Sequence, residues 1–167
     1  MHKEIERKFI FRGDLGRVTS GCDKAYIEDY YFNKYTRLRK EEKYYLWEGE
    51  YRKHSSSTSI DIKGDGTLER DETSILVPYM NTPTDLAPLL KKWRYFVKYA
   101  GHIFEVNEYV DLPLIIVEVE LERVDEDVLL PYFCGEEITH MLNYYNYNLW
   151  GEINKKYGRA DRVSESS

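Results

Sequence analysis

The chain has 167 residues, which is enough for one domain with a buried core, and its formal net charge is −6. This acidic balance gives no electrostatic support for general nucleic-acid binding, although a local basic site stays open. Cys22 and Cys134 lack metal-ligand spacing and fit a reduced chain, and no apolar run approaches the roughly 20 residues of a membrane span. We therefore expect a cytoplasmic protein without a membrane partner.

Short runs rich in Tyr, Ile, Val and Phe, separated by clusters of turn residues, predict a mainly β domain. In chain order, the expected strands span residues 4–11, 26–32, 36–40, 44–48, 59–63, 69–76, 93–99, 102–109 and 115–123. We expect these strands to form one sheet-based domain over residues 1–157.

A few segments between and after the strands have other compositions. Residues 13–22 give a weak signal for a short helix, and the Ser-rich segment 54–59 is typical of a mobile loop tip. Residues 84–92 and 136–157 have the apolar spacing of helices that pack outside a sheet. The polar residues 158–167 predict a disordered tail.

Charged residues recur at every second position in seven of the expected strands. On a strand, residues two apart leave the same face. The sets are Glu4 with Glu6 and Lys8, Arg37 with Arg39, Asp61 with Lys63, Arg70 with Glu72, Lys92 with Arg94, Glu105 with Asn107, and Glu118 with Glu120. One such strand alone is expected to turn its charges to solvent. Seven together favour a sheet closed into a barrel, with an acidic and a basic set inside one water-filled bore.

A bore of this kind has a chemical requirement. Buried Arg and Lys that face buried Glu are costly unless a ligand and metal ions complete the arrangement. A triphosphate matches several Arg and Lys donors, while carboxylates bind Mg²⁺ or Mn²⁺. Hydrolysis then needs only a water molecule held in line with the terminal phosphorus, without a covalent nucleophile.

The sequence resembles the CYTH superfamily, also called the triphosphate tunnel metalloenzymes, along nearly the whole chain. The E-x-E-x-K pattern at residues 4–8 is moderately specific by itself. It is followed, in the family's order, by RLR at 37–39, IKG at 62–64, RDE at 70–72, KWRY at 92–95, FEVN at 104–107, VEVEL at 117–121 and GEEIT at 135–139. The resemblance implies an α+β fold with a closed eight-stranded antiparallel β-barrel, a tunnel with helices packed outside, and metal-dependent action on a triphosphate.

The resemblance also implies roles for individual residues. The metal-binding side chains would be Glu4, Glu6, Glu118, Glu120, Glu105 and Asn107. The phosphate-binding side chains would be Lys8, Arg37, Arg39, Lys63, Arg70, Lys92 and Arg94. The catalytic set would be Glu72, which is similar to the carboxylate that holds metal or the attacking water, together with Glu6 and Lys8.

Two positions depart from the family pattern. Ser74 stands where R-x-E-x-E has its second acid, and Asn107 stands where an Asp ligand is common. Glu105 shares the strand face of Asn107 and is an alternative ligand. Both departures bear on the second metal site, because an amide brings no negative charge to a cation.

Three functions remain open at this point. The first, which we favour because the short single-domain form resembles bacterial members of this type, is hydrolysis of inorganic tripolyphosphate or of a nucleoside triphosphate such as ATP. The second is a class IV adenylyl cyclase, which would release pyrophosphate. The third is a module that binds nucleotides or polyphosphate without turnover. A homodimer is also left open.

Overall fold

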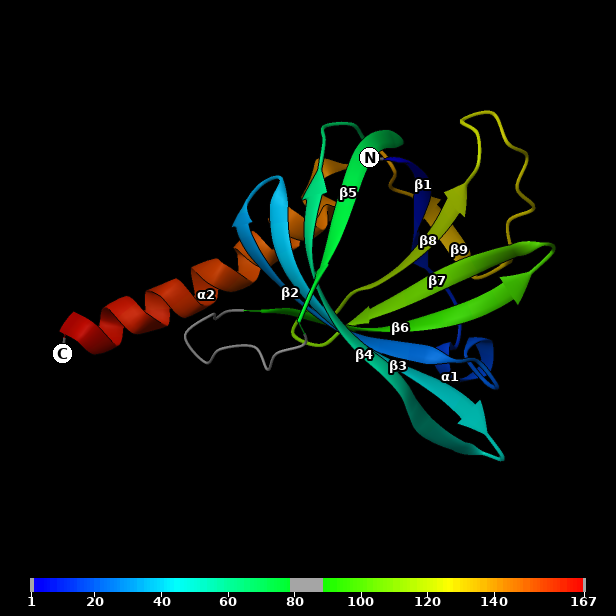
Figure 1. Cartoon of the computed structure of the whole chain (residues 1–167), viewed down its shortest axis with the longest axis horizontal. Coiled ribbons are helices and arrows are strands. Elements are labelled where there is room, and N and C mark those ends of the chain that lie inside the picture. Colours follow the sequence, from blue (N-terminus) through cyan, green and yellow to red (C-terminus); the bar gives the residue numbers. More distant parts are fainter. Residues whose placement is uncertain (1, 79–88, 167) are drawn as a thin grey trace.

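The computed structural model describes residues 2–78 and 89–166 of the chain (Figure 1). Within these residues the strands are β1 (His2–Phe11), β2 (Lys24–Asn33), β3 (Thr36–Trp47), β4 (Glu50–Lys63), β5 (Glu69–Val77), β6 (Leu90–Tyr99), β7 (His102–Tyr109), β8 (Ile115–Leu121) and β9 (Cys134–Glu137). The helices are α1 (Leu15–Val18), the 3-10 helix η1 (Leu142–Tyr144) and α2 (Asn146–Ser166). The predicted mainly β fold is confirmed.

Eight of the strands form a tunnel-like ring of antiparallel neighbours. The hydrogen-bonded order is β5-β4-β3-β2-β6-β7-β8-β1, and β1 also pairs with β5, which closes the ring. β1 uses one edge for two partners, because residues 2–5 pair with β5 and its far end pairs with the short strand β9. The ring of eight antiparallel strands agrees with the predicted tunnel.

Most of the apolar core lies on the outer face of the ring. In β1 the apolar residues Ile5 and Phe9 alternate with the charged residues Glu4, Glu6 and Lys8. Alternate side chains of a strand point to opposite faces, so an apolar outer face leaves the charges to the inside. The outer cluster consists of Ile5, Phe9, Val97, Phe104, Val106, Val117, Val119, Leu121, Phe133 and Cys134.

A second apolar cluster lies where α2 packs against the strands. Leu90, Tyr109 and Ile116 share strand faces with the inward residues of β6, β7 and β8, and they pack with Leu149 and Ile153 of α2. The tunnel is therefore charged along its middle and apolar where the C-terminal helix meets it.

The long β3–β4 hairpin corrects two sequence predictions. β3 is continuous where two strands, 36–40 and 44–48, were predicted, and β4 includes residues 54–59, which were predicted as a loop tip. Backbone pairing explains the error, since Ser55, Ser56 and Ser57 lie in register with β3 and a ladder of backbone hydrogen bonds does not require apolar side chains. The turn is instead at Glu48 and Gly49, whose positive φ angles of 48° and 79° suit a tight hairpin.

The helical segments also differ from their predicted bounds. α1 confirms the short helix within residues 13–22, and Asp14 caps it by accepting from the Arg17 backbone N–H. Of the predicted helix 84–92, residues 84–88 lie outside the described residues, and residues 90–92 belong to β6 because they pair with β2. The predicted helix 136–157 is wrong at its start, where β9 pairs with β1, and α2 begins only at Asn146. The α2 backbone continues to Ser166, across most of the segment that the sequence predicted as a tail.

Candidate active site

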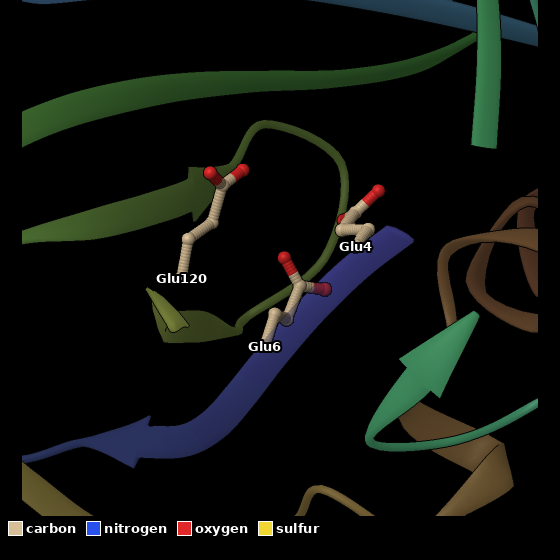
Figure 2. Close-up of side chains that lie close together, drawn as sticks. All are labelled: Glu4, Glu6 and Glu120. Atoms are coloured by element: carbon tan, nitrogen blue, oxygen red, sulfur yellow. The ribbon is translucent and has the colours of Figure 1, made fainter. Parts of the chain in front are cut away.

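An acidic cluster on β1 and β8 forms one wall of the tunnel. Glu6 lies in register with Glu120, and Glu4 is two residues away on the same face of β1. The three side chains each bring a carboxylate oxygen within 4.8 Å of the others. Figure 2 shows their carboxylates gathered over the two strands. Glu4 and Glu6 are buried and Glu120 is exposed, so the cluster is open to solvent on the side of Glu120.

Three cations bind the buried part of this cluster. Arg70 Nη2 donates to Glu4 Oε1 at 2.9 Å and to Glu6 Oε1 at 2.8 Å. Lys63 Nζ lies 3.4 Å from Glu4 Oε2, and Lys8 Nζ lies 3.5 Å from Glu6 Oε1. Each of the two buried acids, Glu4 and Glu6, is thus in contact with two cations.

These cations decide the charge state of the acids. Burial raises the pKa of Glu4, but Lys63 and Arg70 outweigh it and the pKa falls to about 2. Burial likewise opposes ionisation of Glu6, and Lys8 and Arg70 bring its pKa to about 2. Burial and the neighbouring charges of Glu4 and Glu6 raise the pKa of Glu120. Two members of the cluster are therefore firmly ionised at neutral pH.

The donor atoms of the cluster suit a hard cation. All are carboxylate oxygens, which Mg²⁺, Mn²⁺ and Ca²⁺ prefer. Glu4 Oε2 is buried and has no hydrogen-bond partner within the described part of the chain. The Lys63 ammonium group, 3.4 Å away, compensates part of the charge of this oxygen, and a divalent cation at the cluster would compensate more of it. The residues present therefore fit a divalent metal ion.

The other predicted metal ligands form a separate group around Arg94 on β6. Arg94 Nη1 lies 3.1 Å from Glu105 Oε2, and Arg94 Nε donates to Asn107 Oδ1 at 2.8 Å. Arg94 Nη2 is 3.9 Å from Glu118 Oε2, and Asn107 Nδ2 donates to Glu118 Oε1 at 3.4 Å. The structure thus divides the six predicted ligands into two groups of three. Asn107 turns its oxygen to a guanidinium group.

Glu105 differs in charge state from the acids of β1. Burial raises its pKa to about 7, in spite of Arg94, and the neighbouring charge of Glu118 adds to this effect. A carboxyl group that titrates near neutral pH has the proton affinity of a general acid or base. Its position two residues from Asn107 on β7 was predicted, but its protonation depends on burial that the sequence does not show.

The opposite wall pairs its arginines with two acids, Asp29, which the sequence analysis did not place in the tunnel, and Asp61, which it placed there without a role. Asp29 on β2 has no exposed surface and accepts from Arg39 Nε and Nη2 at 2.7 Å and 2.8 Å. Asp61 on β4 accepts from Arg37 Nε at 2.8 Å and from Ser74 Oγ at 2.6 Å. Asp61 and Ser74 are register partners, so an inward acid stands on β4 directly beside the position where the family pattern has one on β5.

Two lysines of the tunnel, the buried Lys92 and the partly buried Lys63, have lowered pKa values. Lys92 is fully buried, its Nζ has no hydrogen-bond partner among the described residues, and the nearest ring centroid, that of Tyr109, is 5.6 Å away. Burial, followed by Arg94 and Arg39, lowers its pKa well below the usual value. Burial and Arg37 lower the pKa of Lys63 to about 7. Both lysines are placed to gain stability from an anionic ligand.

Glu72, the predicted catalytic carboxylate, lies at the edge of this arrangement. It is two residues from Arg70 on β5, so both side chains leave the same face. It is in register with His2 and Lys63, and its Oε2 lies 4.0 Å from His2 Nε2. It does not belong to the carboxylate cluster found among the described residues, and its catalytic role stays a prediction.

Comparisons with known proteins agree with the observed fold. No protein-family model matches the sequence. The inorganic triphosphatase of Acetivibrio thermocellus is 29% identical over 159 residues, which cover 89% of this chain and 94% of that protein. A crystal structure of the inorganic triphosphatase NE1496 has a TM-score of 0.55 at 21% identity, over 90% of this chain and 95% of the other. A second structure, of the hypothetical protein NE1496, has a TM-score of 0.53 at 23% identity, over 88% and 97%.

A ring of eight antiparallel strands around facing acidic and basic side chains is the arrangement that the resemblance to the triphosphate tunnel metalloenzymes implied. The chain is thus similar to a named inorganic triphosphatase in sequence and to solved triphosphatase structures in fold, in agreement with its resemblance to the CYTH superfamily. Among the described residues, no helix is long and apolar enough to cross a membrane.

Proposed function

We propose that this protein is a divalent-metal-dependent triphosphatase, with inorganic tripolyphosphate as its first candidate substrate and nucleoside triphosphates next. The observation that carries the proposal is the direct contact between the carboxylate cluster and the cations Lys8, Lys63 and Arg70. The name of the Acetivibrio thermocellus relative supports the same reaction.

Glu4, Glu6 and Glu120 would hold the metal ion, Mg²⁺ or Mn²⁺. Bound there, the ion would supply positive charge that offsets the phosphate oxygens and lowers the pKa of a nearby water. The chain itself binds and orients the substrate. Burial disfavours the charged forms of Lys63 and Lys92, and contact with phosphate would stabilise these charged forms. Arg70 stays fixed between Glu4 and Glu6, which positions its charge before the substrate arrives.

The remaining carboxylates can hold the attacking water. Glu6 is ionised and held by Lys8, so it can accept a hydrogen bond from water but is a weak base. Glu72 and Glu105 lie further along the tunnel wall. Because phosphoryl transfer depends mainly on positioning and charge, a water held in line by these groups is sufficient, and no nucleophilic side chain is required.

The proposal is tested by phosphate release from tripolyphosphate and from ATP, with Mg²⁺ or Mn²⁺ and after complete chelation. The wild type should release phosphate only with metal, and Glu6→Gln should lose roughly 100-fold or more in kcat/KM, because one cluster ligand loses its charge. Glu50→Gln, at an exposed residue of β4, is the control and should behave as the wild type.

Each alternative function predicts a different product. Cyclic AMP and pyrophosphate from ATP would identify a cyclase. Metal-dependent binding of both triphosphates without product would identify a capture module. Phosphate release that survives chelation would contradict the metal dependence, and intact metal-dependent turnover in Glu6→Gln would contradict the assigned site.

A further inference from the structure

A cavity of about 360 Å³ opens beside the tunnel where α2 begins. Its walls come from the β2–β3 turn, the loop between β4 and β5, η1 and the first turn of α2. Four tyrosines line it, Tyr31, Tyr35, Tyr145 and Tyr147. A cavity of this size with aromatic walls and a few polar groups is typical of a site for a small organic molecule.

The cavity is continuous with the proposed phosphate site. Lys8, Lys63 and Arg70 line it, and each of these side chains also contacts Glu4 or Glu6. The Lys8 ammonium lies 5.0 Å from the centre of the Tyr145 ring, so a tunnel cation and a cavity wall touch directly. A phosphate held by these three cations would therefore have its substituent next to the tyrosines.

Tyr35 is fixed at the mouth of the cavity before any ligand binds. Its backbone N–H donates to Asn33 Oδ1 at 2.8 Å, and its carbonyl accepts from the Lys63 N–H at 2.8 Å. Its hydroxyl donates to Asp65 Oδ2 at 3.3 Å. The side chain is nevertheless 43% exposed. A ring that is both held and exposed can stack on a planar group at little cost in conformational entropy.

The aromatic lining distinguishes between ligands of different chemistry. A polyphosphate chain gains little from phenol rings, whereas a heterocyclic base stacks on any aromatic face. Leu142 of η1, which is 59% exposed, adds an apolar surface to the same cavity. We propose that the cavity binds the base of a nucleoside triphosphate whose phosphates are held by Lys8, Lys63 and Arg70. This inference rests on the proposed triphosphatase function, because it uses the same phosphate site.

Binding to the purified protein tests the inference without turnover. The probes are the β,γ-imido analogues of ATP and of tripolyphosphate, measured by calorimetry with Mg²⁺. Tyr35→Ala should weaken binding of the ATP analogue about tenfold and leave binding of the tripolyphosphate analogue unchanged, because only the base contacts the ring. Tyr35→Phe should bind like the wild type, since it keeps the ring and loses only the hydroxyl contact to Asp65.

Two further variants make the result independent of folding defects. Leu142→Ala removes a side chain from the facing wall and should reduce binding of the ATP analogue alone. Tyr45→Ala, at an exposed tyrosine of β3 that does not line the cavity, is the matched control and should change neither affinity.

Equal affinities for the ATP analogue in wild type, Tyr35→Ala and Leu142→Ala would overturn the inference, as would equal losses for both analogues. Phosphate release measured in parallel keeps the two proposals apart. Tripolyphosphate hydrolysis without selective loss of ATP binding leaves the triphosphatase standing and removes the base site. Selective loss of ATP binding without any phosphate release supports the base site and removes the triphosphatase.

Discussion

The two charged walls of the tunnel solve the problem of buried charge in different ways. On β1 and β8 the acids Glu4, Glu6 and Glu120 crowd together, and one buried oxygen of Glu4 has no hydrogen-bond donor among the described residues. On β2, β3 and β4 the arginines Arg39 and Arg37 each have an acid of their own. The charges of the first wall are fully compensated only when a ligand binds, whereas the arginines of the second wall are compensated by their own acids. Stability and function should therefore respond to different substitutions.

The pairing on the second wall should dominate stability. Asp29→Ala would leave the Arg39 guanidinium buried without its bidentate partner, and loss of one member of a buried pair costs about 3–5 kcal/mol. Burial opposes ionisation of Asp29, but Arg39 and Arg37 hold its pKa below the usual range, so the pair is charged at neutral pH. Urea unfolding should show this loss.

An exposed pair of the same residue types provides the control. Arg123 Nε lies 3.5 Å from Asp125 Oδ1, and both side chains are largely exposed. Asp125→Ala should change the free energy of unfolding by less than about 0.5 kcal/mol, because solvent screens an exposed ion pair. Similar losses for the two variants would contradict the view that burial of Asp29 gives the wall its stability.

Glu105, in the group around Arg94, should make the stability of the metal-free protein sensitive to pH. Between its ordinary pKa of 4.5 and its folded pKa of about 7, Glu105 binds more protons in the folded than in the unfolded state. Its contribution to stability is therefore present below pH 4.5 and is lost as the pH rises through 7, by roughly 3 kcal/mol from the shift. Glu105→Gln should remove this decline in the melting temperature.

Glu4 and Glu6 provide the opposite sign in the same experiment. Their pKa values fall from 4.5 to about 2, so their stabilisation is present above pH 4.5 and is lost as the pH falls toward 2. Metal-free protein should thus be most stable near pH 4.5 as far as these three acids decide it. A melting temperature that rises steadily from pH 4.5 to 7 in the wild type would contradict the assignment.

Glu120→Gln should separate activity from stability. Loss of a cluster ligand should reduce metal-dependent kcat/KM for tripolyphosphate by roughly 100-fold. Because burial, and then repulsion from Glu4 and Glu6, raise the pKa of Glu120, the neutral side chain should leave the metal-free melting temperature unchanged or higher. Phosphate release and thermal unfolding in chelator measure the two effects. Wild-type kinetics with a lowered melting temperature would give Glu120 a structural role instead.

The comparison of the two walls also shows what the sequence could predict. The period of two placed the charged residues of β1, β3, β6, β7 and β8 on inward faces, because alternation along a strand is local. The sequence pattern did not predict Asp29 as a tunnel residue, because its neighbours on the same strand face, Ala25, Ile27 and Tyr31, are apolar and buried. Only the pairing of β2 with β3 brings Asp29 opposite Arg39.

The division of the six candidate metal ligands into two groups also depends on strand pairing, so the sequence could not predict it. Glu118 and Glu120 are neighbours on one face of β8, yet Glu120 is opposite Glu6 while Glu118 is opposite both Lys8 and Glu105. Register is set by strand pairing over the whole ring, and a local pattern does not contain it. The sequence also did not predict the full length of β4, because backbone pairing with β3 holds Ser55, Ser56 and Ser57 in the strand.

The smallest effect is expected at Asn107, although its position in the family pattern suggests a metal ligand. Its Oδ1 accepts from Arg94 Nε at 2.8 Å, and its Nδ2 donates to the carbonyl of Ile116 at 3.2 Å. An Asp in its place would keep the contact with Arg94 but lose the amide donor, so stability should fall by about 1 kcal/mol. The new charge would lie with Glu105 and Glu118, apart from the cluster of Glu4, Glu6 and Glu120. The Mg²⁺ concentration for half-maximal phosphate release should therefore change less than about twofold in Asn107→Asp, whereas Glu120→Gln should raise it strongly. A marked decrease in Asn107→Asp would show that metal is bound at the Arg94 group as well, and the tunnel would then hold metal at two places.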